Sequence, residues 1–277
     1  MLKYVAYTIC FDFIYIAQQI FYTLRSTQRN QVSGYYLMYR LLVATFFLST
    51  VVFGLSVSKY RNYWLIYLSD IGILLQTLHL VTAAAVPVRL SSLIKKVTHF
   101  TIKYDGVDDT LPLLARFSMF LYNVTNVLTL GISFFFWAGI AFIDREPKDT
   151  DFLVHGMNSI MSVSDIFISK RPCRLFHFHH SMAVLVPYFL FTVAYWAAGG
   201  RNEYGGSYIY PVLNWDNLPL TIPFVMGILT VGVIFFHTLV WTFHLLRDGV
   251  ISCANKDVGG VELHNNIKHQ SLRNNPA

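Results

Sequence analysis

Six long apolar stretches separated by short polar segments dominate the hydrophobic pattern of this sequence. A helix needs about 20 mostly apolar residues to cross the hydrocarbon core of a bilayer. The pattern therefore predicts an all-α polytopic membrane protein, a bundle of six transmembrane helices. Pro87 is expected to end the second helix, and the Gly199–Gly200 pair the fifth. The predicted spans are Tyr35–Val57, Tyr63–Val88, Phe117–Ile143, Phe152–Ser169, Leu175–Ala198 and Leu218–Leu246.

The stretch Tyr4–Leu24 is also apolar, but it carries Asp12, Gln18 and Gln19. These polar residues favour an interfacial or bundle-packed helix, with a seventh span as the alternative. We therefore expect residues 1–252 to form a single membrane domain, in which residues 1–34 are an N-terminal interfacial segment. The polar residues 253–277 are expected to be a disordered cytoplasmic tail.

The composition agrees with a membrane protein, because 55% of the residues are hydrophobic and only 13% are charged. Soluble domains carry about 25% charged residues. The net charge of +6 is consequently not a sign of nucleic-acid binding. The cysteines Cys10, Cys173 and Cys253 are widely separated, which argues against a disulfide framework and against a zinc site. No cofactor is predicted.

Lysine and arginine are unevenly distributed across the predicted topology. If the N-terminus lies inside, 16 of the 21 basic residues fall on the inner side of the membrane and 5 on the outer side. Cytoplasmic loops of membrane proteins are enriched in basic residues. Both termini are therefore predicted to be cytoplasmic, and the plasma membrane and the endoplasmic reticulum are the alternative locations.

Ionisable side chains within predicted spans are expensive and usually face the bundle interior. On the outer side, Ser69 and Asp70 lie about two turns deep and His155 about one turn deep. A hydroxyl and an imidazole in the same leaflet are the minimum for a hydroxyl nucleophile with a histidine general base. The alternative is structural: a serine bonded to the carbonyl one turn back, and a histidine that bridges helices.

A second polar group is predicted nearer the cytoplasm. Asp165 lies about 15 Å further in than His155, too far to orient it. Arg40 and Asp165 each require a partner or a wet cavity. Imidazoles with a carboxylate suit zinc or iron, and a bis-histidine haem is a related alternative. Interhelix histidines without a metal are the simpler interpretation. The inner histidines are His79, His177, His179, His180, His237 and His244.

Four ordered motifs carry a family resemblance over about residues 35–250. They are "MYRLLVA", "NYWLIYLSDIG", "DFLVHGMNSIMSVSDIFISKRPCRLFHF" and "YIYPVLNWDNLP". The chain resembles the rolling stone family of multi-pass membrane proteins, which is associated with myoblast fusion. That association implies no particular molecular activity.

A weaker resemblance reaches the androgen-induced membrane hydrolases, six-span enzymes that cleave fatty-acid esters of hydroxy fatty acids with an intramembrane threonine and a histidine. In "WLIYLS", Ser69 stands where those enzymes have the threonine, so the hydroxyl is kept and the methyl is lost. In "HGMNS", His155 stands at the place of their histidine, and Asn158 replaces a second histidine of that stretch.

The first functional hypothesis is therefore an intramembrane lipid-ester hydrolase. Ser69 would be the nucleophile and His155 the base, with Asp70 as a candidate orienting group, although it points about 100° away from Ser69 on a helix. Asn158 would help to hold the oxyanion, and Tyr210 in the aromatic outer loop would contact substrate. Membrane lipids, including a lipid ester entering from the outer leaflet, are the expected partners, and nucleic acid is not.

Two other classes of function stay open. The first is a non-catalytic membrane protein that acts in cell–cell fusion through its loops, although the short outer loops disfavour a large adhesive surface. The second is a haem or metal protein that uses the inner histidines.

Overall fold

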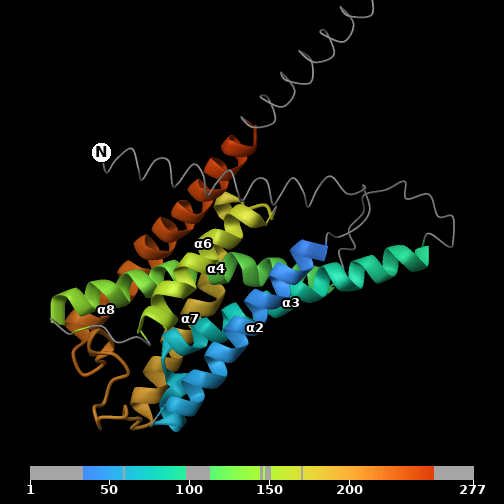
Figure 1. The fold of residues 1–277 in the computed structure, drawn as a ribbon. Coiled ribbons are helices and arrows are strands. Elements are labelled where there is room, and N and C mark those ends of the chain that lie inside the picture. Colours follow the sequence, from blue (N-terminus) through green and yellow to red (C-terminus); the bar gives the residue numbers. More distant parts are fainter. Residues whose placement is uncertain are drawn as a thin grey trace, which may run out of the picture.

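The computed structural model describes residues 34–58, 60–97, 113–143, 146, 151–169 and 171–252, and every regular element among them is helical. The helices pack side by side into one bundle (Figure 1). Five helices of the described part are long and apolar enough to cross a membrane, and the 17-residue stretch Phe152–Ile168 is a shorter apolar helix. The predicted all-α polytopic fold is confirmed.

The helix bounds follow most of the predicted spans. The main elements are α2 (Gly34–Val57), α3 (Leu68–Val97), α4 (Leu113–Ile143), the π-helical turn η2 (Phe152–Gly156) with α6 (Met157–Ile168), α7 (His179–Ala197) and α8 (Leu218–Gly227). Three 3-10 turns, η1 (Arg61–Ile66), η3 (Leu175–Phe178) and η4 (Pro211–Leu213), precede α3, α7 and α8. The π-helical turn η5 (Ile228–Gly232) continues α8 into a helical run that ends at Ser252.

The second span differs from its prediction at both ends. Helix α3 begins at Leu68 because the chain before it forms η1, and Tyr67 then has an extended backbone. Pro87 was wrongly predicted to end the helix, since α3 continues to Val97. Transmembrane helices tolerate proline because neighbouring groups satisfy the carbonyl that it leaves free. The apolar part of α3 nevertheless ends at Val86.

Helix α4 is the central helix of the bundle. It packs against α3, α6 and α7, and every residue from 121 to 129 is buried. Within its apolar window 56% of the residues are buried, against 17% for the helix Leu218–Ser252. A helix that is buried on all sides belongs to the interior of a bundle. Helix α4 therefore sets the relative depth of the side chains that surround it.

Two glycines have clear local roles. A Cβ atom on Gly72 would lie 2.8 Å from the Ile132 side chain, so the glycine permits close packing of α3 on α4. Gly199 has a φ of +74°, a left-handed conformation that suits glycine at a helix end. It follows the last residue of α7 closely, as the glycine pair predicted.

The predictions for Tyr4–Leu24 and for the tail 253–277 fall outside the described residues. The division into one membrane domain and a tail therefore stays a prediction.

Candidate functional site

Ser69 lies at the outer end of α3, beneath the loop that joins α7 to α8. The Tyr210 hydroxyl accepts a hydrogen bond of 2.9 Å from the Leu68 backbone N–H and interacts with the Ser69 hydroxyl. Burial raises the pKa of Tyr210, so its phenol stays neutral. Next to it, the Tyr188 hydroxyl donates to the Ile66 carbonyl at 3.0 Å. The fold thus brings two of the predicted site residues, Ser69 and Tyr210, into contact.

Asp70 belongs to the same outer end but faces other groups. Its carboxylate interacts electrostatically with Glu203 of the α7–α8 loop. Glu203 also accepts a hydrogen bond from Tyr67, whose pKa is raised by burial and by this carboxylate. Asp70 therefore joins a small acidic and phenolic group under the loop.

His155 occupies the π-helical turn that precedes α6. Its ring stacks on Phe136 of α4, with centroids 3.6 Å apart and planes inclined by 17°. Its backbone carbonyl accepts a hydrogen bond of 2.6 Å from the Ser133 hydroxyl. Asn158, one turn further along, is buried, and its Oδ1 has no hydrogen-bond partner among the described residues. π-helical turns occur frequently at functional sites.

The five predicted site residues thus form two groups, one around Ser69 and one around His155. Gly72, one turn inward from Ser69, touches Ile132, while the neighbouring Ser133 bonds the His155 carbonyl. Helix α4 therefore places Ser69 and His155 at a similar level of the bundle. Within the described part of the chain no hydrogen bond joins their side chains, and their roles stay predictions.

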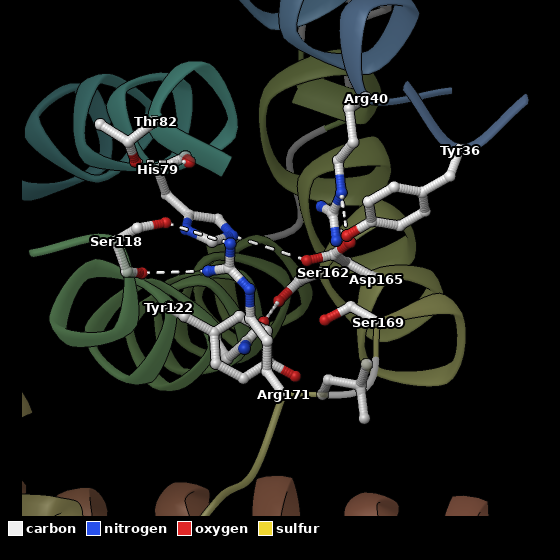
Figure 2. Close-up of polar contacts among 12 residues, drawn as sticks. Tyr36, Arg40, His79, Thr82, Ser118, Tyr122, Ser162, Asp165, Ser169 and Arg171 are labelled. Carbon is white, nitrogen blue, oxygen red and sulfur yellow. Dashed lines mark hydrogen bonds and ion pairs between the residues drawn. The ribbon is translucent and has the colours of Figure 1, made fainter. Parts of the chain in front are cut away.

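A buried charged cluster lies deeper, where α2, α3, α4 and α6 meet (Figure 2). Arg40 and Asp165 form an ion pair of 2.5 Å, and His79 Nε2 lies 3.5 Å from the other Asp165 oxygen. The three side chains are at most 2% exposed. The Tyr36 hydroxyl accepts a second bond from Arg40 at 2.9 Å. The expectation that Arg40 and Asp165 need partners is confirmed, and each is the other's partner.

Helices α4 and α6 are joined by a seam of buried polar contacts that extends from the His155 level to this cluster. Ser162 donates to Asn126 Oδ1 at 2.5 Å, and Ser159 donates to the Thr129 carbonyl at 3.4 Å. Ser133 completes the outer end through the His155 carbonyl. In lipid, such side-chain bonds hold helices together where hydrophobic attraction between them is weak.

Two arginines form hydrogen bonds at the inner end of the seam. Arg247 donates to the carbonyls of Ile166, Ser169 and Arg171, so it caps the C-terminus of α6. Arg171 in turn donates to the backbone and the hydroxyl of Ser118 on α4, each at 3.1 Å. These bonds fix the end of α6 against its neighbours.

Three of the inner histidines form hydrogen bonds with protein groups. His237 Nε2 pairs with the Arg174 carbonyl at 3.0 Å, and His179 Nδ1 pairs with the Phe176 carbonyl at 2.8 Å. His244 Nε2 shares a 2.8 Å hydrogen bond with the Tyr122 hydroxyl. No group of three metal-ligating side chains comes together in the part of the chain that the structure describes. Burial raises the pKa of the Cys173 thiol to about 11, which disfavours the metal-binding thiolate.

Comparison with known proteins decides the family. The family model described as Protein rolling stone matches residues 4–254. The chain belongs to the rolling stone family. The Protein rolling stone of Drosophila melanogaster is 29% identical over 210 residues, which cover 75% of this chain and 76% of the fly protein. No solved structure matches the chain. As a rolling stone family member with several helices able to span a bilayer, the protein is an integral membrane protein.

The seam is the feature of this rolling stone protein that sequence reasoning missed. Its members on α6 are buried and recur every three or four residues, which places them on one helical face. The recurrence of polar residues every three or four positions could be seen in the sequence of α6, and a similar recurrence could be seen in α4. These residues are His155, Asn158, Ser162, Asp165 and Ser169.

Proposed function

We propose that this rolling stone protein is an intramembrane lipid-ester hydrolase in which Ser69 is the nucleophile and His155 the general base. The observation that supports the proposal is the similar depth of the two residues beside α4. Gly72 of α3 and His155 of η2 contact adjacent residues of that helix, Ile132 and Ser133. Both residues also match the places of the catalytic pair in the androgen-induced hydrolases.

The chemistry would proceed in two steps. His155 takes the hydroxyl proton as Ser69 Oγ attacks the ester carbonyl, and the alcohol leaves with that proton. Water then cleaves the acyl-serine, and His155 again carries the proton. The attack requires the hydroxyl and the imidazole to approach within about 3 Å. Ser69 must exchange its contact with Tyr210 for the imidazole as substrate enters.

The neighbouring residues have separate roles in this proposal. Tyr210 bonds the first backbone N–H of α3, so it fixes the outer loop over Ser69. Asn158 lies one turn beyond His155, and its side-chain amide would donate to the oxyanion. The apolar helix faces around them provide the route by which a lipid ester enters from the outer leaflet.

Labelling with a fluorophosphonate probe tests the nucleophile. The purified wild-type protein and the Ser69→Ala, His155→Ala and Ser56→Ala variants would be compared in lipid nanodiscs by fluorescence on a gel. Ser56 is the matched control, because it is an exposed serine near the outer end of α2 that bonds a carbonyl of its own helix. We expect strong labelling of the wild type and Ser56→Ala, and its loss in the other two variants.

Equal labelling of the wild type and Ser69→Ala would overturn the assignment. A protein that hydrolyses no lipid ester and takes no label would instead favour the non-catalytic alternative.

A further inference from the structure

Five polar side chains follow one face of η2 and α6 from one end to the other. His155, Asn158, Ser162, Asp165 and Ser169 are separated by three or four residues, and each is at most 7% exposed. Polar residues at membrane depth are expensive, and chains of Asp and His within spans are typical of proton relays. A purely structural contact between two helices would not require two ionisable groups on the same face.

Helix α4 presents a matching polar face to this line. Ser118, Tyr122, Asn126, Thr129 and Ser133 recur at the same spacing, and each is at most 6% exposed. Hydrogen bonds along α4 extend from Ser133, which donates to the His155 carbonyl at the outer end, to Ser118, which accepts from Arg171 at the inner end. Together the two faces form a buried polar line between α4 and α6.

Several buried polar atoms along this line have no hydrogen-bond partner among the described residues. Buried polar atoms of proteins are normally satisfied by protein groups or by ordered water. The line therefore has the chemistry of a path that water molecules can occupy. On the two faces the atoms are Asn126 Nδ2, Asn158 Oδ1 and Ser169 Oγ. His79 of α3 lies beside Asp165, and its Nδ1 also has no hydrogen-bond partner among the described residues.

The Asp165–His79 pair gives the middle of the line a group that can bind a proton. Asp165 Oδ2 faces His79 Nε2 at 3.5 Å, so the carboxylate favours the tautomer that carries its proton on Nε2. His79 Nδ1 then presents its lone pair as a base. Arg40 contacts the other carboxylate oxygen and holds Asp165 in place.

Further ionisable groups surround His79 and extend toward the inner side. The Tyr122 ring lies 5.6 Å from the His79 ring, and its hydroxyl bonds His244, which bonds the Val240 carbonyl. Charged and titratable groups of the neighbouring helices surround His79 and its partners. They are Tyr36, Tyr39 and Arg40 of α2, Tyr122 of α4, Asp165 of α6, Arg171 after α6, and His244 and Arg247 of the last helix.

We propose that this polar line conducts protons across the membrane, with His79 as its central carrier. A proton bound at Nδ1 makes the imidazolium, which releases its Nε2 proton to Asp165 Oδ2. Asp165 then passes this proton to the next group or water molecule of the line and returns to the carboxylate. Tautomer exchange then restores the starting form. One proton enters for each that leaves, so nothing is oxidised or consumed, and the pH difference or the membrane potential drives the flow. The activity is independent of Ser69 and of ester cleavage.

Proton flux into vesicles tests this activity in the full-length protein. Phosphatidylcholine vesicles with an entrapped pH-sensitive dye would be loaded with potassium, and valinomycin would set an inside-negative potential. We expect the wild type to acidify the vesicle interior much faster than protein-free vesicles. His79→Gln keeps a donor for Asp165 but cannot carry a proton, so its rate should fall to the protein-free level.

Two further variants make the test robust. His244→Gln interrupts the inner end of the line and should also reduce the flux. His180→Gln removes a histidine at the inner surface, outside the line, and should conduct as the wild type does. Monodisperse elution in size-exclusion chromatography would show that the variants are folded.

A wild-type rate equal to that of protein-free vesicles would overturn the proposal. Proton flux at the wild-type rate in folded His79→Gln would also overturn it. If His79→Gln does not fold, the same result in folded His244→Gln would overturn it instead. Because the assay contains no ester, its result is independent of fluorophosphonate labelling.

Discussion

At the residue scale, the pairing of Arg40 with Asp165 is the most consequential contact. A lone charge inside the bundle would be costly, whereas the pair and the neighbouring Tyr36 hydroxyl satisfy most of the charged atoms. The sequence predicts that both residues need partners, because each stands inside an apolar run. It does not predict which partner, because the rotation of α2 and α6 about their axes depends on packing throughout the bundle.

Removing one partner of the pair tests this contact. We expect Arg40→Leu to destabilise the protein by about 3–5 kcal/mol, since it leaves the Asp165 carboxylate buried and unpaired. The free energy of unfolding would be measured in mixed micelles with increasing SDS.

The double variant Arg40→Leu with Asp165→Leu is the control, because it removes both charges at once. We expect it to recover much of the lost stability. Equal stability of the wild type and Arg40→Leu would show that the pair does not hold the bundle together.

At the element scale, α6 is defined by its polar face and by the cap at its end. Its depth and its bounds were predictable from the apolar run, and the structure differs from the predicted span by one residue. The cap was not predictable, because Arg247 comes from a helix far along the chain. Three carbonyls at the end of α6 accept from this one guanidinium.

The Arg247→Ala variant tests the cap. Hydrogen bonds from a charged group contribute about 1.5–3 kcal/mol each when buried. Because the three bonds share one nitrogen, we expect a loss of about 2–3 kcal/mol and a lower midpoint of thermal unfolding in detergent.

Arg201→Ala serves as the comparison, since the Arg201 guanidinium donates to one exposed carbonyl, that of Gly205. It should change the midpoint little. If the two variants unfold at the same temperature, the cap contributes no stability.

At the scale of the whole molecule, the bundle has one end rich in tyrosine and acidic groups and another rich in basic groups. The excess of lysine and arginine at one side predicts the orientation. The fold class and most helix bounds could also be predicted from the lengths of the apolar stretches in the sequence. The start of α3 and its passage through Pro87 could not: the chain before α3 forms a 3-10 turn, and the helix continues past the proline to Val97.

Labelling of single cysteines tests the orientation. In a variant without the native cysteines, Tyr204→Cys and Phe176→Cys place thiols beyond opposite ends of α7, at sites where the native side chains are 83% and 77% exposed. For protein at the cell surface, a membrane-impermeant maleimide should label Tyr204→Cys in intact cells. It should reach Phe176→Cys only after permeabilisation, and the reverse pattern would contradict cytoplasmic termini.

The buried charges also constrain how the chain is made. Helix α2 leaves the ribosome with Arg40 long before α6 follows with Asp165. An unpaired arginine or aspartate at the centre of a helix opposes insertion by about 2.5–3.5 kcal/mol. The cost is smaller for Arg40 and Asp165, because Arg40 lies near the start of α2 and Asp165 near the end of α6. Until α6 is synthesised, Arg40 has no Asp165 to pair with, and its side chain can extend toward the near membrane surface. We therefore expect the bundle to assemble only after Asp165 of α6 reaches Arg40 of α2. A chain truncated before α6 should be degraded.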